Sequence, residues 1–154
     1  AIGGQHETKK LPEDKMVELC NAITGSVVLI GGKDDAFVGE RVKFACENVI
    51  NLCGMVSIKQ SALIIQQSAV VVTHDTGMMH IAAALKKRVL SIWGNTIPDF
   101  GMYPYMADES SEQFEVTNLK CRPCSKIGYA TCPKGHFNCM QQQNIASIAR
   151  AANA

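Results

Sequence analysis

The stretch AVVVTHDTGMMHIAAAL, residues 69–85, contains the change of pattern that decides the fold. It opens with an apolar run, continues through a polar cluster at 73–77, and then places apolar residues at helical spacing from Met78 to Leu85. This order predicts a buried parallel strand, a tight turn and a helix that packs back on the sheet. In open α/β sheets, ligands bind beyond the carboxyl ends of the strands, where helix N-termini present unpaired N–H groups. The DTG turn at 75–77 is therefore our first candidate for a phosphate-binding site.

The composition indicates one domain without a strong charge. The 154 residues are 47% hydrophobic, enough for one core, and the formal net charge is +1. Nucleic-acid binders usually carry a large basic excess, so we expect no nucleic-acid partner. No apolar run approaches the ~20 residues that span a bilayer and no signal-peptide pattern is present, which favours a cytoplasmic protein. The opening AIGG resembles the end of a strand whose first residues are missing, so we expect a fragment of a longer chain.

Strand-like and helix-like segments alternate along the sequence. Helices are predicted at about 12–23, 34–48, 57–67, 78–85 and 143–152, and strands at 2–4, 26–31, 49–52, 70–73, 89–93 and 114–116. Such alternation requires right-handed crossovers and a parallel sheet covered on both faces. We therefore predict a Rossmann-like, doubly wound α/β fold in a single domain, residues 1–154.

Polar residues follow the predicted strands and would gather at one edge of the sheet. They are Thr8 and Lys9, Asp34 and Asp35, Val56 and Ser57, the group Asp75, Thr76, Gly77 and His80, and finally Asn95 and Thr96. This edge offers N–H groups and hydroxyls for phosphate oxygens, a lysine for charge and a carboxylate for ribose hydroxyls. No Gly-x-Gly-x-x-Gly follows the first strand and no Gly-x-x-x-x-Gly-Lys is present, which argues against nicotinamide, flavin and P-loop sites.

Each of these residues also has a purely structural interpretation. Asp75 and Thr76 are suited to capping their helix, and the two carboxylates that start the second helix are better explained by capping than by binding. His80 lies one turn into its helix, where a half-buried histidine is as good an explanation as a ligand contact. Met78 fits a core or pocket wall, and Lys9 fits a solvated surface charge. Spacing alone leaves these alternatives open.

Five segments in this order resemble glycosyltransferase family 9, the ADP-heptose:lipopolysaccharide heptosyltransferases. They are TKKLP (8–12), LIGGKDD (29–35), GMVSI (54–58), HDTGMMHIAAAL (74–85) and SIWGNTIPDF (91–100), and the resemblance covers about residues 1–140. Members have the GT-B architecture of two Rossmann-like domains, of which the carboxyl-terminal one binds the nucleotide sugar and the amino-terminal one binds the acceptor. The resemblance implies that this chain is the donor-binding half of an inverting enzyme that moves heptose from ADP-heptose to lipopolysaccharide core.

The resemblance also implies roles for individual residues. The implied binding set is Thr8, Lys9, Asp34, Val56, Asp75, Thr76, Gly77, Met78 and His80. Within it Lys9 and His80 are the implied catalytic residues, and Lys9 with the helix amides would stabilise the leaving ADP, so that transfer requires no cofactor or metal. Asp34 stands where the family usually has a longer, ribose-binding glutamate, and Leu11 replaces a common tryptophan. These two departures leave the donor's identity less defined than its class.

The implied catalytic base and the acceptor site belong to the missing amino-terminal domain. We therefore expect this fragment to bind the ADP-sugar donor and to transfer little or nothing by itself. The implied partners are that donor and the lipopolysaccharide core, and the implied location is the cytoplasm, at the inner face of the inner membrane through the full-length enzyme. A nucleotide-sugar epimerase shares the GT-B fold but would carry different residues at this edge.

Seven cysteines are many for a cytosolic domain. Three lie in or beside apolar segments and are predicted to be small core residues: Cys20, Cys46 and Cys53. The other four form C-x2-C-x7-C-x6-C within a cysteine-rich subregion at 121–139: Cys121, Cys124, Cys132 and Cys139. Four thiolates at this spacing fit a structural zinc site, while reduced packing thiols explain them equally well and disulfides are disfavoured in the cytosol. The alternative function is therefore a non-catalytic, zinc-stabilised binding or interaction module.

Overall fold

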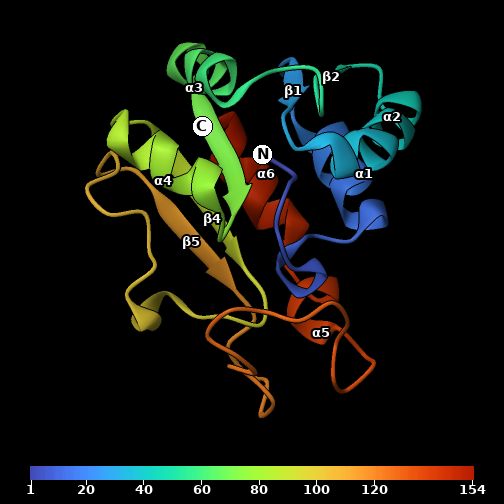
Figure 1. The fold of residues 1–154 in the computed structure, drawn as a ribbon, viewed down its shortest axis with the longest axis vertical. Helices are drawn as coiled ribbons and strands as arrows, with labels where there is room; N and C mark the ends of the chain where they lie inside the picture. The colour runs from blue at the N-terminus through green and yellow to red at the C-terminus, as the bar shows by residue number, and fades with distance from the viewer.

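Helices and parallel strands alternate through the computed structural model, which describes all 154 residues (Figure 1). The strands are β1 (Val27–Leu29), β2 (Val49–Asn51), β3 (Val70–His74), β4 (Arg88–Trp93) and β5 (Glu112–Glu115). The helices are α1 (Glu13–Ala22), α2 (Ala36–Ala45), α3 (Ile58–Gln67), α4 (Gly77–Ala84), α5 (Asn138–Gln141) and α6 (Ile145–Asn153), with 3-10 turns η1 (Glu7–Lys9), η2 (Lys33–Asp35) and η3 (Pro98–Phe100). The predicted helices and the five later strands are present, and the short α5 and the 3-10 turns were not predicted.

Local side-chain hydrogen bonds explain where two helices begin. The Ser57 hydroxyl accepts from the Gln60 N–H while the Gln60 side chain accepts from the Ser57 N–H at 2.8 Å, which is a capping box at the start of α3. Before α2, the Asp35 carboxylate accepts from the Gly32 N–H at 2.8 Å and closes the turn that leads into the helix. Asp35 occupies the N-cap position of α2 but makes no side-chain bond to that helix, so its structural role is in the preceding turn and not in the predicted capping of α2.

The strands form two parallel sheets where the sequence suggested one. β1 pairs with β2, and β3 pairs with β4, which pairs with the edge strand β5. The amino terminus lies between the two sheets (Figure 1). There the Ile2 N–H donates to the Ile30 carbonyl at 3.0 Å, and the Ala1 amino group donates to the Val72 carbonyl at 2.6 Å. The predicted strand at 2–4 is thus an extended segment too short to form a regular ladder with either sheet.

Helices cover both faces of the strands, as a doubly wound fold requires. Helices α3 and α4 bury a core on one face, centred on Met79, Val89 and Trp93. Helices α1, α2 and α6 bury a larger core on the other face, which includes Val42 and Ile148. Because both faces are covered, β1, β3 and β4 are mainly apolar, whereas the edge strand β5 (EQFE) is mostly polar.

Cys20, Cys46 and Cys53 are buried in the larger core, which confirms their predicted packing role. Burial raises the pKa of the Cys20 and Cys53 thiols to about 11, so both stay protonated and unreactive near neutral pH. None of the helices combines the length and the apolar character that crossing a bilayer demands.

Candidate functional site

A buried ion pair lies where β3 gives way to α4. The Lys9 Nζ is 2.6 Å from the Asp75 Oδ2, and the Thr96 hydroxyl donates to the same oxygen at 3.0 Å. These side chains are nearly inaccessible, with exposed fractions of 11% for Lys9 and 5% for Asp75. Three segments that are far apart in the sequence therefore converge: the turn η1, the end of β3 and the loop after β4. Lys9 and Asp75 were both predicted to lie at this edge of the sheet, and they are in contact there; their part in donor binding stays a prediction.

The amino-terminal end of α4 is open. No side chain caps it, although Thr76 occupies the N-cap position, and the buried Thr76 Oγ1 has no hydrogen-bond partner. Gly77 is exposed, and a Cβ added there would meet nothing within 4 Å. The first-turn N–H groups of a helix lack partners within the helix and carry partial positive charge. Because Asp75 binds Lys9 and Thr96 instead of capping α4, these donors remain available to an anion.

A second ion pair lies at the end of the other sheet. The Lys10 Nζ is 3.0 Å from the Asp35 carboxylate and 2.7 Å from that of Glu7. Desolvation opposes the charged form of Lys10, but the hydrogen bonds to Glu7 and Asp35 outweigh it and raise the pKa of its ammonium group. Neither Lys10 nor Asp35 belongs to the predicted binding set, although Asp35 was predicted to lie at this edge of the sheet. Asp34, which does belong to that set, is exposed, on η2.

His74 is a structural residue that the sequence analysis missed. It is 3% exposed, and its Nε2 accepts from the Leu11 N–H at 3.0 Å, so that the end of β3 is held to the start of α1. Burial lowers the pKa of His74 to about 3, with the positive charges of the amino terminus and Lys10 acting in the same direction. The imidazole is therefore neutral at physiological pH, with its proton on Nδ1.

Thr8 connects the ion-pair region to the cysteine-rich subregion. Its side chain is buried, and its hydroxyl accepts from the Tyr129 N–H at 2.8 Å and donates to the Tyr129 carbonyl at 3.1 Å. Because both functions of the hydroxyl are used within the chain, Thr8 positions the turn η1 beside Lys9. Its contact with phosphate stays a prediction.

Arg122, which also belongs to the cysteine-rich subregion, binds the loop that follows β4. Its guanidinium donates to the Gly94 and Thr96 carbonyls, the latter at 2.8 Å, and to the Glu115 carboxylate at 2.6 Å. The Arg122 side chain is 5% exposed. A buried arginine with this many acceptors fixes the loop that carries the Thr96 hydroxyl. No motif in the sequence identified this arginine in advance.

The predicted zinc ligands do not assemble in this structure. No three side chains among histidine, cysteine, aspartate and glutamate come close enough together to hold a metal ion, and all seven cysteines are free. The Cys121 Sγ lies 3.7 Å from the His136 Nε2, whereas the Cys124 thiol donates to the Cys121 carbonyl. Burial raises the pKa of Cys139 to about 11, which keeps that thiol protonated. Of the four cysteines only Cys139 is buried, and the other three are half-buried.

The remaining residues of the predicted binding set are divided between core and surface. Val56 and Met78 are half-buried and pack against the core beneath α3 and α4. His80 is exposed on α4, one turn from its open end. Val56 and Met78 therefore form an apolar surface, and His80 presents an accessible imidazole. All three lie on the side of the three-stranded sheet, as the Lys9–Asp75 pair does.

The fold and this site define a class of protein: a Rossmann-like α/β domain with an open helix terminus beside a buried ion pair at the carboxyl ends of its strands. The sequence profile of Glycosyltransferase family 9 (heptosyltransferase) matches residues 2–133. The chain therefore belongs to glycosyltransferase family 9.

Curated relatives support this assignment along part of their length. Lipooligosaccharide heptosyltransferase 2 of Haemophilus influenzae is 30% identical over 121 residues, which cover 74% of this chain and 34% of the relative. Lipopolysaccharide heptosyltransferase 2 of Escherichia coli is 30% identical over 100 residues, which cover 60% of this chain and 29% of the relative. The matched region thus spans about a third of these enzymes.

Solved structures show the same fold. The E. coli ADP-heptose lps heptosyltransferase II matches 99% of this chain and 46% of its own, with a TM-score of 0.66 and 20% identity. A family 9 glycosyl transferase from Veillonella parvula matches 99% of this chain and 43% of its own, with a TM-score of 0.75 and 17% identity. The domain is one Rossmann-like half of the GT-B fold, as predicted from the sequence.

Proposed function

We propose that this chain is the donor-binding, carboxyl-terminal half of an inverting glycosyltransferase that moves heptose from ADP-heptose to lipopolysaccharide core. The open amino-terminal end of α4 beside the Lys9–Asp75 pair is the observation that carries this proposal. Membership of family 9 and the heptosyltransferase names of the relatives supply the substrate class. The combination favours a diphosphate whose oxygens accept from the first-turn N–H groups of α4.

The ion pair determines how charge is supplied to that diphosphate. In the unliganded chain Asp75 neutralises Lys9, so the α4 amides provide the available positive potential. Lys9 contributes to phosphate binding only by sharing its ammonium between Asp75 and a phosphate oxygen. In the transfer step the acceptor hydroxyl attacks the anomeric carbon with inversion, the bond to the leaving ADP breaks, and negative charge grows on its terminal phosphate. Lys9 and the amides oppose that growing charge, with His80 accessible at the sugar side.

The ribose and adenine of the donor would contact Asp34, Val56 and Met78. Asp34 is exposed, so its carboxylate is available to ribose hydroxyls. Val56 and Met78 present a half-buried apolar surface, which suits the adenine ring. In this proposal the base that activates the acceptor hydroxyl comes from the other half of the enzyme. The full-length enzyme acts in the cytoplasm, at the inner membrane. The chain alone binds donor without transferring it, and transfer needs no metal.

Titration calorimetry of this chain with ADP, UDP and GDP tests the proposal. We expect ADP to bind more tightly than the other two, and ADP to slow hydrogen exchange at the Gly77 and Met78 amides. The sharpest variant is Thr76→Ala, because the Thr76 hydroxyl has no internal partner whose loss would disturb folding. A hydrogen bond to a charged phosphate contributes ~1.5–3 kcal/mol, so this variant should bind ADP about tenfold or more weakly.

The matched control is Thr131→Ala, which removes an exposed threonine from the cysteine-rich subregion. Its ADP affinity should equal that of the unchanged chain. Tighter binding of UDP would redirect the donor within the glycosyltransferases, and the absence of any nucleotide binding by a folded chain would refute donor binding. Stoichiometric zinc without nucleotide affinity would instead favour an interaction module, for which the arrangement of the cysteines offers no support.

A further inference from the structure

Two cysteines of the cysteine-rich subregion form a neighbouring pair of thiols. Cys121 and Cys124 enclose the sequence Cys-Arg-Pro-Cys, and the Cys124 thiol donates to the Cys121 carbonyl at 2.8 Å. Burial, followed by the nearby Cys121 side chain, raises the pKa of the Cys124 thiol. Both cysteines are free and only half-buried, so a small molecule in solvent reaches them. A C-x-x-C pair of this kind is typical of sites that form and break a disulfide.

His136 is placed to stabilise a negative charge on the Cys121 sulfur. Its Nδ1 accepts from the Asn138 N–H at 3.0 Å, so the proton of the neutral ring is on Nε2. The Nε2 lies 3.7 Å from the Cys121 Sγ and donates to it. The thiolate is the form that attacks a disulfide, and an N–H donor favours the charged sulfur. Cys121 is therefore the attacking residue of the pair, and Cys124 is the residue that completes the bond.

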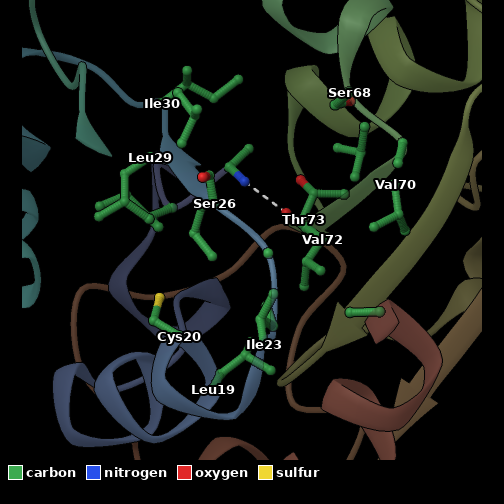
Figure 2. A pocket seen from close by; sticks show the side chains of 18 of the residues that line it. Leu19, Cys20, Ile23, Ser26, Leu29, Ile30, Ser68, Val70, Val72 and Thr73 are labelled. Atoms are coloured by element: carbon green, nitrogen blue, oxygen red, sulfur yellow. Dashed lines mark hydrogen bonds between the residues drawn. The ribbon is translucent and has the colours of Figure 1, made fainter. Parts of the chain in front are cut away.

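Another pair of neighbouring cysteines, Cys20 and Cys46, shows how burial changes the same chemistry. Their exposed fractions are 5% and 3%, and Figure 2 shows Cys20 among apolar side chains that include Leu19 and Ile23. Burial, with the neighbouring Cys46 acting in the same direction, raises the pKa of the Cys20 thiol to about 11. This pair stays protonated and shielded, so it is an internal reference for the half-buried pair.

Arg122 lies within the Cys-Arg-Pro-Cys sequence and connects it to the candidate site. Its guanidinium donates to two carbonyls of the loop at 94–96, and the N–H of Cys124 donates to a third at 3.0 Å. The same loop carries the Thr96 hydroxyl that binds Asp75. A disulfide has an S–S bond of about 2.0 Å, so its closure draws the chain together on both sides of Arg122. Oxidation therefore moves the groups that hold this loop.

We propose that Cys121 and Cys124 are a reversible redox site, at which a low-molecular-weight disulfide closes them into an intrachain disulfide and thereby weakens donor binding at the end of α4. Disulfides in a reducing compartment are usually transient and serve catalysis or redox sensing. The loop at 94–96 transmits the effect, because it holds a partner of Asp75 beside the helix terminus. The effect on the donor rests on the proposed function, whereas formation of the disulfide does not.

The reaction consists of two thiol–disulfide exchange steps. The Cys121 thiol releases its proton to solvent, and its thiolate attacks one sulfur of the small disulfide, whose S–S bond breaks as one thiolate leaves. The Cys124 thiol then loses its proton and attacks the Cys121 sulfur of the mixed disulfide, which releases the second thiolate. Two protein thiols are oxidised, one small disulfide is reduced to two thiols, and an excess of dithiol reverses the reaction.

Treatment of the reduced chain with oxidised glutathione, followed by mass spectrometry, tests the site. We expect one intrachain disulfide, between Cys121 and Cys124, which excess dithiothreitol reduces. Cys124→Ser should stop at the mixed disulfide with glutathione, because the residue that completes the bond is absent. The matched control Cys132→Ser removes another half-buried cysteine and should leave the reaction unchanged.

Two variants of the histidine separate its effect on the sulfur from a general disturbance of the loop. His136→Ala should slow formation of the mixed disulfide at least ~3-fold, because the attacking sulfur loses its N–H donor. His136→Gln keeps a side-chain N–H and should recover part of that rate. Equal rates in the unchanged chain and in His136→Ala would overturn the role of the histidine.

Calorimetry with ADP measures the effect on donor binding. We expect the oxidised chain to bind ADP about fivefold more weakly than the reduced chain, which is at the lower end of usual coupling between two sites. The double variant Cys121→Ser, Cys124→Ser, treated with oxidised glutathione in the same way, should bind ADP as tightly as the reduced chain.

The two measurements fail in different ways. A disulfide between other cysteines, or oxidation of Cys20 and Cys46 at the same rate, would overturn the assignment of the site. Equal ADP affinity of the reduced and the fully oxidised chain would overturn the effect on the donor. A reduced chain that binds no ADP would refute the proposed function instead, while mass spectrometry still decides whether the disulfide forms.

Discussion

The two sheets end in ion pairs that differ in burial and in connection. At the end of the three-stranded sheet, Asp75 is buried and binds both Lys9 and Thr96. At the end of the two-stranded sheet, Lys10 divides its ammonium between Asp35 and the exposed Glu7. The consecutive lysines Lys9 and Lys10 thus hold one turn against both sheets, and the Lys9 ion pair is the more deeply buried of the two. The three-stranded half is therefore organised before any ligand binds, whereas the two-stranded half has an exposed carboxylate, Asp34, that is free to bind a ligand.

Removing the buried carboxylate should produce the largest loss of stability. Asp75→Ala leaves the nearly inaccessible Lys9 ammonium without its partner and the Thr96 hydroxyl without its acceptor. Breaking a buried pair on one side costs about 3–5 kcal/mol, and we expect the free energy of unfolding in urea to fall by about 3 kcal/mol. The double variant Lys9→Met, Asp75→Leu should recover part of that loss, because no charge is left unpaired. A double variant as unstable as Asp75→Ala would contradict this view of the pair.

The second-largest effect should come from lowering the pH, which should reduce the free energy of unfolding because His74 holds β3 to the start of α1. The unfolded chain protonates His74 below about pH 6.5, whereas the folded chain does so only near its pKa of about 3. Between these values the unfolded state binds more protons, so stability is complete above pH 6.5 and falls as the pH decreases. At 1.36 kcal/mol per unit, His74 accounts for a loss of about 2 kcal/mol from pH 6.5 to pH 5.

Urea unfolding of the unchanged chain and of His74→Gln, measured at several pH values, isolates this contribution. Subtracting the two curves removes the titration of the carboxylates and of the amino terminus, which both proteins share. A difference that does not change between pH 6.5 and pH 5 would show that His74 is charged or accessible in the folded chain.

The two adjacent carboxylates of η2 should give the smallest and most selective effects. Asp35→Ala removes the acceptor of Lys10 and of the Gly32 N–H, and should cost about 1–2 kcal/mol of stability. Asp34→Ala, the matched control, should change stability by less than ~0.5 kcal/mol because the residue is exposed. Calorimetry with ADP should show the reverse order, with the larger loss of affinity in Asp34→Ala. Equal effects of the two variants on stability would remove the distinction between the two carboxylates.

Much of the fold followed from periodicity because each element has a local signal. The capping box at Ser57 marks the start of α3, and the apolar run at 70–73 marks β3, so both were predicted close to their observed bounds. The division into two sheets was not predictable in the same way. Strand pairing depends on what lies between β1 and β3, and the periodicity of either strand carries no information about its neighbour.

The candidate site was predicted in part for a related reason. Residues directly after strands, such as Asp75, were found because parallel strands end at one edge. Arg122 and His74 were missed because their roles come from burial and from carbonyl or N–H partners distant in sequence. The cysteine spacing suggested zinc, but spacing along the chain does not fix the distances between thiols, and the structure leaves them unassembled.

The sequence by itself determined the α/β class, the helix and strand positions and the family, because these depend on local pattern and on motifs such as HDTGMMHIAAAL. Only the packed layers fix which carboxylate pairs with which lysine, that no side chain caps α4, and that the strands form two sheets. The physical reason is that pairing and burial depend on distances between segments far apart in the chain, and these distances exist only once the layers have packed.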